Sequence, residues 1–321
     1  QTEASLAAPF NSQIASISCA PLLVREGRAA LTTSFSSFKY MTLYSFVQLT
    51  TAAMLLLCNG IIRANQFIAF DMITVLALGT FLTFAGTSKT LDHQRPSASL
   101  ISTPIIGSIV LQTIVQIFFQ AMARFFAPIG HDWGNLPYTE TSMKKLDQYY
   151  NVVMIIASSY QYIWTALICG MGGKYRAPLI KNTYLVCWAA GLAICYTVLF
   201  VVSWDIYPED EDSILDETAM EDYFRDKFFA GIIFGLVPMK LKAATRYFLV
   251  LMGLLNLLAS VCAELVVLPF VVDAVAAYKS AFVHSTLSRR DQLAAYTIDD
   301  LEKSDLPTRP NIHKKPLMKK F

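Results

Sequence analysis

Long apolar blocks are the feature of this sequence that most limits how the chain can fold. A helix that crosses a hydrocarbon core about 30 Å thick needs roughly 20 apolar residues. Six blocks reach that length: 41–62, 67–86, 100–123, 152–171, 183–204 and 247–270. Inside a bilayer every backbone amide must be bonded within the protein, so continuous blocks favour helices over short alternating strands. The sequence therefore predicts an all-α fold, a polytopic helical bundle with six transmembrane helices.

The composition agrees with a membrane protein. Hydrophobic residues make up 55% of the chain and charged residues only 16%, with a mean hydropathy of +0.45. A soluble globular domain carries about 25% charged residues. The six cysteines include no CxxC pair, and none lies in the two larger loops predicted outside the cytosol. A disulfide framework is therefore not expected.

The basic residues predict the orientation of the chain. Six spans place both termini on one side, and most of the 26 Lys and Arg fall in the segments predicted on that side, which are 1–40, 87–99, 172–182 and 271–321. Because basic residues favour the cytosolic side, both termini are expected in the cytosol.

The domain organisation follows from these spans. We expect residues 1–37 to be the end of a cytosolic domain with its stalk, residues 38–270 to be the transmembrane domain, and residues 271–321 to be a partly disordered cytosolic tail. The chain starts at Gln1 and shows no secretory signal, so the N-terminal part of a longer protein is expected to be absent.

Two carboxylates fall within predicted spans, Asp71 in the second and Glu264 in the sixth. A carboxylate at the centre of a bilayer costs about 2.5–3.5 kcal/mol on insertion scales, so each should face the bundle interior or water. Asp71 lies near the extracytosolic end of its helix, where it could meet an entering cation. Glu264 lies near the cytosolic end, and a structural role is expected for it.

Tyr44, Gln48 and Thr51 in the first span are spaced i, i+4 and i+7, which predicts one shared helix face. A tyrosine ring and an amide dipole both suit an ammonium group. Hydrogen bonds between helices would explain the same pattern equally well. Function and packing therefore stay open for these residues.

Other polar residues in the spans are expected to serve packing. Gln112, Gln116 and Gln120 recur every four residues, which favours interhelical hydrogen bonds. The adjacent residues 160–162 point to different faces and are interpreted as packing. An acidic run at residues 205–227 could attract polycations, although a solvated loop is the simpler reading.

Motifs of chemical catalysis are absent from the sequence. It contains no GxxxxGK[ST] loop, no HExxH, no zinc-ligand spacing and no GxSxG, and its four histidines are scattered. We therefore expect no catalytic residue and no metal site within this chain.

Several motifs resemble the P-type ATPases. VREGRAAL resembles the segment that leads into the fifth transmembrane helix of such pumps, and FKYMTLYSFVQ resembles one branch, the polyamine-transporting ATPases of class five, subgroup B. Further matches follow in order along the chain: QFIAFD, QRPSASLIS, SSYQYI and KYRAPLIKN. The acidic run and the basic tail do not resemble the family.

The resemblance implies that the six spans are helices five to ten of a pump that uses ATP and Mg²⁺ bound outside this chain. Such pumps couple an aspartyl phosphate to alternating access and carry polyamines from the endolysosomal or vacuolar lumen to the cytosol. Tyr44, Gln48 and Asp71 match positions that face the substrate groove. Asp71 would pair with an ammonium, Tyr44 would stack on it, and Gln48 would hydrogen-bond to it.

Two alternatives are carried with this reading. One is a P-type pump for an inorganic cation, which would bring several carboxylate and amide ligands to one compact site, whereas Asp71 is alone on its helix. The other is a non-enzymatic six-helix channel or scaffold.

Overall fold

A computed structural model describes residues 16–58, 60–97, 99–126, 140–201 and 243–282. The chain divides into two compact units, 1–270 and 271–321. Within the second unit, residues 271–282 are helical. The elements discussed below all belong to the first unit.

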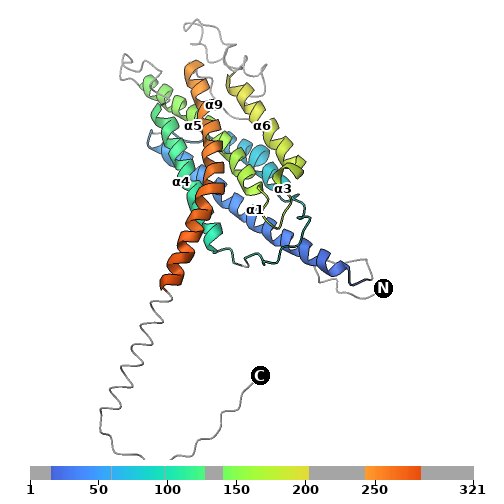
Figure 1. Ribbon diagram of the computed structural model, residues 1–321. Coiled ribbons are helices and arrows are strands. Elements are labelled where there is room, and N and C mark those ends of the chain that lie inside the picture. The colour runs from blue at the N-terminus through green and yellow to red at the C-terminus, as the bar shows by residue number, and fades with distance from the viewer. Residues whose placement is uncertain (1–15, 59, 98, 127–139, 202–242, 283–321) are drawn as a thin grey trace, which may run out of the picture. The chain divides into compact units, whose positions relative to one another are not determined.

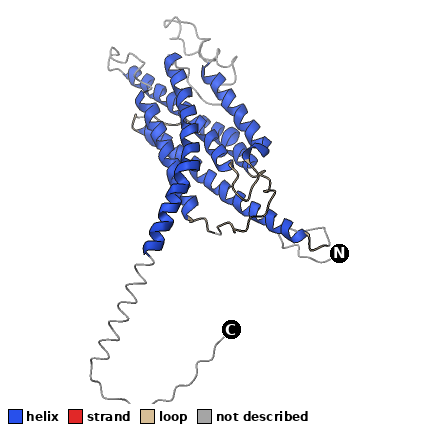
Figure 2. Cartoon of the chain, viewed as in Figure 1, coloured by secondary structure: helices blue, strands red, loops and turns tan. Residues whose placement is uncertain are grey.

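The described chain consists of helices and short connections. In order they are α1 (Cys19–Leu56), α2 (Ala64–Ala69), the π-helix η1 (Phe70–Leu76), α3 (Ala77–Leu82), α4 (Thr103–Phe126), α5 (Glu140–Gly170), the 3-10 turn η4 (Leu179–Lys181), α6 (Thr183–Val201), α9 (Ala243–Cys262) and the π-helix η7 (Ala263–Val267) (Figure 1). The described ranges contain no strand, only one isolated antiparallel bridge between Thr87 and Arg176 (Figure 2). The predicted all-α class is confirmed for this part of the chain.

Helix α5 forms the centre of the first unit. It packs against α1, α4, α6 and α9, and almost all of Tyr149–Gly170 is buried. Helix α4 buries one stripe only and exposes large apolar side chains such as Ile114 and Phe118. Exposed apolar surface of this kind is favourable against lipid rather than water.

The predicted number of six spans is not confirmed. Among the described residues, three helices are long and apolar enough to cross a membrane: Thr103–Phe126, Tyr149–Gly170 and Ala244–Phe282. Two further apolar helices, Gln66–Leu82 and Thr183–Val198, are shorter. The long α1 is not in either set, because polar residues interrupt its apolar sequence.

The end of the first predicted span, residue 62, is wrong. Helix α1 ends at Leu56, and the amides of Cys58 and Gly60 both bond to the carbonyl of Leu55, at 2.8 and 2.9 Å. Such bonds satisfy a carbonyl that has no partner within the helix, as is common at helix ends. The next helix then starts at Ala64, before the predicted residue 67.

The three glutamines of α4 are buried and do join helices, as expected. The amide of Gln112 donates to the carbonyl of Ser260 in α9 at 2.9 Å, and that of Gln120 donates to the Gln161 side chain in α5 at 2.7 Å. The side-chain oxygen of Gln116 accepts from the Asn256 amide in α9 at 3.3 Å, and its backbone carbonyl accepts from Gln161 at 3.1 Å. This row of amides fixes α4 against two neighbours at once.

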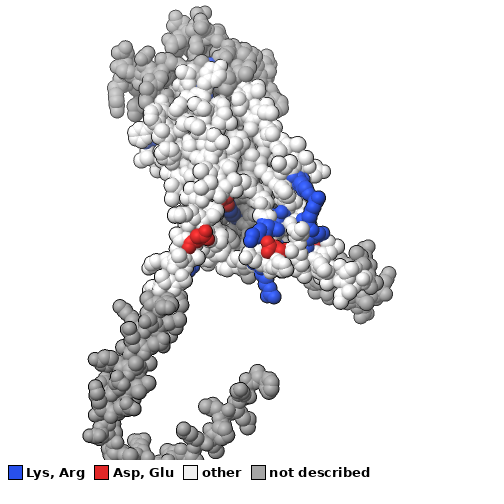
Figure 3. Space-filling model, in the orientation of Figure 1, with Lys and Arg blue, Asp and Glu red and all other residues white. Residues whose placement is uncertain are grey.

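Charged side chains gather at one end of the first unit. On the face shown in Figure 3 they lie around the start of α1 and the loops nearby, while the surface beyond is almost free of charge. Arg28 of α1 donates to the backbone carbonyls of Asp92 and Gln94, and Arg176 donates to those of Cys169 and Met171. These bonds tie the loop before α4 to α1, and the loop after α5 to the end of α5.

Some predictions lie outside the described residues, including the acidic run at 205–227 and most of the tail at 271–321. The placement of both termini in the cytosol and the boundary at residue 37 stay predictions.

Candidate functional site: an intramembrane carboxylate

Helix α1 presents Tyr44 and Gln48 on successive turns. Both side chains are half-buried, whereas the intervening Val47 and the preceding Leu43 are buried in the core. The core residues hold α1 against α4 and α5, so the two polar residues lie at the edge of the packed region. The packed neighbours therefore hold Tyr44 and Gln48 in place, while both side chains stay partly accessible.

Asp71 meets Gln48 directly. The Gln48 amide nitrogen donates to the Asp71 carboxylate at 2.8 Å, although 23 residues separate the two positions. Asp71 stands in the first turn of η1, a π-helix, and is itself half-buried. Single π-turns inserted in α-helices occur frequently at functional sites.

Tyr162 of α5 completes this group. Its side chain is only 2% exposed, forms a side-chain hydrogen bond with Gln48 and lies close enough to Asp71 and Tyr44 to interact with both. The Phe70 ring packs on it with 5.5 Å between ring centroids. We call Tyr44, Gln48, Asp71 and Tyr162 the Asp71 site.

The sequence interpretation had assigned Tyr162 to packing. No signal in the sequence separated it from Tyr160, whose hydroxyl instead bonds to the Thr197 hydroxyl at 2.8 Å. Only the rotation of α5, which is set by its neighbours, places Tyr162 beside Asp71. Tyr44 also packs beside Tyr40, with 6.3 Å between ring centroids.

Thr51 does not join the Asp71 site, although its spacing predicted a shared face. It is buried, and its hydroxyl accepts a hydrogen bond from Gln120 at 3.0 Å. Three residues advance an α-helix by about 300°, so Thr51 lies roughly 60° around the helix from Gln48, a drift of the polar face. That drift carries Thr51 toward α4.

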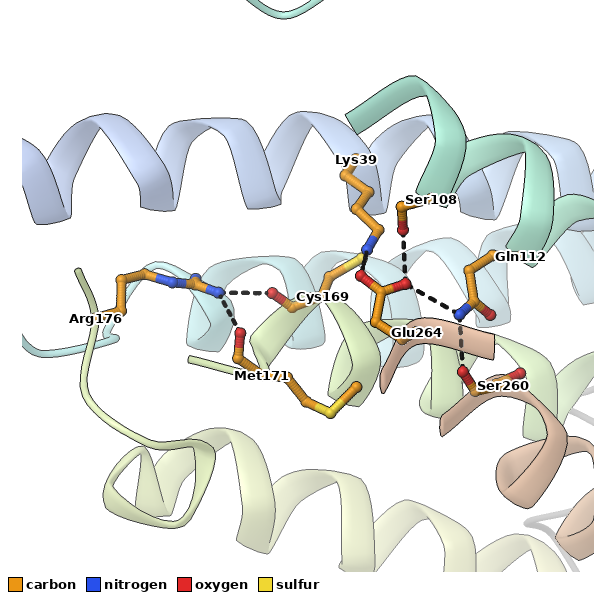
Figure 4. Close-up of polar contacts among 8 residues, drawn as sticks. All are labelled: Lys39, Ser108, Gln112, Cys169, Met171, Arg176, Ser260 and Glu264. Carbon is orange, nitrogen blue, oxygen red and sulfur yellow. Dashed lines mark hydrogen bonds and ion pairs between the residues drawn. The ribbon is translucent and has the colours of Figure 1, made fainter. Parts of the chain in front are cut away.

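Asp71 and Glu264, the two carboxylates of the predicted spans, differ in their charge partners. Glu264 forms an ion pair with Lys39 at 2.6 Å and accepts further hydrogen bonds from Ser108 and Gln112 (Figure 4). Within the described part of the chain, Asp71 has no cationic side chain within ion-pair distance. The Asp71 carboxylate therefore has a hydrogen-bond donor, Gln48, but no charge partner among the described residues.

The ligand sets that metal ions need are not found among the described residues. Where the structure is described, no three His, Cys, Asp or Glu side chains are grouped so that they could hold a metal ion. The Asp71 site offers one carboxylate, one amide and two phenols, a donor set that suits an organic cation better than a dehydrated divalent ion.

Comparison with curated proteins gives several relatives, although no family model matches. The chain is 36% identical over 200 residues to polyamine-transporting ATPase 13A2 of Mus musculus, covering 62% of this chain and 17% of that protein. It is 31% identical over 229 residues to polyamine-transporting ATPase 13A3 of Homo sapiens, covering 65% of this chain and 18% of that protein. It is 35% identical over 192 residues to vacuolar cation-transporting ATPase YPK9 of Saccharomyces cerevisiae, covering 57% and 12% respectively.

These relatives are polyamine- or cation-transporting ATPases, so the resemblance seen in the sequence is confirmed. The chain spans less than a fifth of the length of each of them.

Proposed function

We propose that this chain is the membrane part of an ATP-driven P-type pump for organic polycations, and that the Asp71 site is part of its polyamine groove. The observation that carries the proposal is the unbalanced carboxylate of Asp71, placed inside a helical bundle and lined by two phenols and an amide. The relatives that carry polyamine transport in their names support the same substrate class.

The charge of Asp71 argues for a cationic guest. A carboxylate inside a membrane is costly, so it is retained where it pairs with a cation or lines a pathway. A protonated amine would supply the missing positive charge and the N–H donors that a carboxylate accepts. One alkyl ammonium at a time fits this site, because it contains one carboxylate.

The neighbouring side chains have complementary roles in this proposal. The Gln48 amide holds the Asp71 carboxylate in one orientation through the 2.8 Å bond. The faces of Tyr44 and Tyr162 attract a cation through their ring quadrupoles, an interaction worth about 0.5–2 kcal/mol. A polyamine has apolar methylene segments between its amines, and aromatic walls suit these as well.

The energy source lies outside the residues described here. In the proposal, ATP with Mg²⁺ phosphorylates an aspartate in another part of the full pump, and the resulting change of conformation opens the groove alternately to either side. The chain's own residues bind and orient the cation. The proposed direction is from the endolysosomal or vacuolar lumen to the cytosol, with both ends of this chain in the cytosol.

The test uses the full-length pump, purified in detergent, with ATP hydrolysis measured with and without spermine. Stimulation by spermine supports a polyamine pump. An active ATPase that ignores spermine but responds to an inorganic cation would replace the proposal with the inorganic pump. A full-length protein without any ATPase activity would favour a channel or scaffold.

A further inference from the structure

The second membrane carboxylate, Glu264, forms the most completely bonded polar cluster among the described residues. Its oxygen Oε1 accepts from the Lys39 ammonium at 2.6 Å, and Oε2 accepts from the Ser108 hydroxyl at 2.7 Å and the Gln112 amide at 3.2 Å (Figure 4). The pair is largely buried, with 11% of the Lys39 side chain and 17% of the Glu264 side chain exposed.

This bonding leaves Glu264 little capacity for a substrate. A carboxylate has about four acceptor positions, and three are already used within the protein. Its charge is balanced by Lys39, so a second cation would have to displace a residue of the chain itself. Glu264 therefore differs from Asp71, and its role is to be sought in the helices that its bonds connect.

Through Lys39, Glu264 holds helix α1. Lys39 and Gln48 are nine residues apart on α1, which is about 13.5 Å along the axis and two and a half turns. The two side chains therefore leave α1 on opposite sides. Lys39 reaches η7 and Gln48 reaches η1, so α1 is bonded between the two π-helices.

The apolar residues between these two points do not fix the rotation of α1 by themselves. Tyr40, Leu43 and Val47 are buried in the core, but apolar contacts are not directional. Polar bonds inside a bundle are directional, and their groups have few other partners in lipid. The Tyr40 hydroxyl donates to the Val75 carbonyl at 3.4 Å and Thr51 accepts from Gln120 at 3.0 Å, so Lys39 is one of a few directional contacts that set the rotation of α1 and the direction of Gln48.

We propose that Lys39 and Glu264 are a positioning pair for the Asp71 site: their ion pair fixes the rotation of α1 and keeps Gln48 and Tyr44 turned toward η1. The pair acts at a distance and touches no substrate. The consequence for polyamine binding rests on the proposed function, whereas the consequence for the geometry of α1 does not.

The first test measures that geometry without ATP or polyamine. Cysteines replace Gln48 and Asp71 in the full-length pump, and a short bifunctional thiol reagent links them, with the parent protein showing the background from native cysteines. We expect the cross-linking yield to fall severalfold when Lys39→Met or Glu264→Gln is added. Lys174→Met is the matched control, because the Lys174 ammonium bonds only to the exposed Gln94 side chain among the contacts described, at 2.9 Å. An unchanged yield in both variants would overturn the proposal.

The second test separates positioning from simple support of the fold. In the spermine-stimulated ATPase, Lys39→Met should raise the half-saturating spermine concentration about tenfold, since small displacements of binding groups have large effects. Combined with Gln48→Ala, the two changes should be less than additive, because both act through Gln48. Strict additivity would refute the positioning role.

Should Lys39→Met fail to fold, Lys39→Arg and the exchanged pair Lys39→Glu with Glu264→Lys take its place in the cross-linking test. Each keeps opposite charges at the two positions and should restore the yield toward that of the parent. Folded variants that keep the charge pair but lose the cross-link would count against the proposal. If spermine has no effect on the intact pump, the proposed substrate is wrong, and the cross-linking result still decides the role of the pair.

Discussion

Replacing Asp71 by Asn removes the negative charge of the Asp71 site and keeps its shape. The side-chain oxygen of Asn still accepts the hydrogen bond from the Gln48 amide, which is 2.8 Å long in the structure. Two unit charges 4 Å apart at an effective dielectric constant of 20 attract by about 4 kcal/mol. Part of that attraction is offset because the ammonium loses water, and a hydrogen bond to a charged group is worth roughly 1.5–3 kcal/mol net.

That loss corresponds to a rise of about 10- to 150-fold in the half-saturating polyamine concentration, since each 1.4 kcal/mol is a factor of ten. The assay is ATP hydrolysis by the full-length pump over a range of spermine concentrations. Asp92→Asn is the control, because its carboxylate bonds only to the nearby Gln94 amide in the exposed loop among the contacts described. Thermal stability should not fall in Asp71→Asn, since a half-buried carboxylate without a charge partner has been replaced by a neutral amide. If Asp71→Asn and Asp92→Asn gave the same spermine dependence as the parent, Asp71 would have no part in substrate binding.

Three further predictions concern single residues. Tyr162→Phe keeps the aromatic wall but removes the hydroxyl that bonds to Gln48, so we expect a rise of severalfold in the half-saturating spermine concentration with little change in the maximal ATPase rate. Gln161→Leu breaks the bonds that join α5 to α4 and leaves buried partners unsatisfied, which should lower the thermal unfolding temperature in detergent by the equivalent of about 1–3 kcal/mol. Gly172→Ala would place a Cβ atom so close to the Ala177 carbonyl that the loop must move apart, so the purified protein should be less stable. The same change at Gly173, where no atom lies within 4 Å of the added Cβ, should be tolerated.

The helices of this bundle were largely predictable, whereas their ends were not. Apolar blocks mark where a chain can be buried, and this signal located α4 within three residues at each end, whereas α5 begins twelve residues before its predicted span. Ends depend on local backbone bonds, such as those of Cys58 and Gly60 to Leu55, which hydropathy does not encode. Helix α1 begins at Cys19, well before the predicted span 41–62, and its polar first half is supported by contacts of Arg28 with a distant loop.

For the Asp71 site, the sequence supplied the residue types but only part of the arrangement. Gln48 and Asp71 were selected because polar groups within apolar spans are costly, and the structure places them in one hydrogen bond. Tyr162 was missed because its role depends on how α5 is rotated, and Lys39 was missed because it stands at the margin of a predicted span. Thr51 was wrongly grouped with the site, because helical spacing placed it on the face of Tyr44 and Gln48, whereas it bonds to Gln120.

The two π-helices, η1 and η7, hold carboxylates with different surroundings, and neither hydropathy nor spacing predicted these helices. Both membrane carboxylates among the described residues, Asp71 and Glu264, stand in the first turn of a π-helix. A π-turn accommodates an extra residue and leaves part of the backbone bonding of the helix irregular, which has a cost in lipid. At Glu264 that turn brings the carboxylate to three donors of the protein, so the gain is structural. At Asp71 the described chain supplies no cationic partner, and this observation is the reason we propose that a cation from outside the chain binds there.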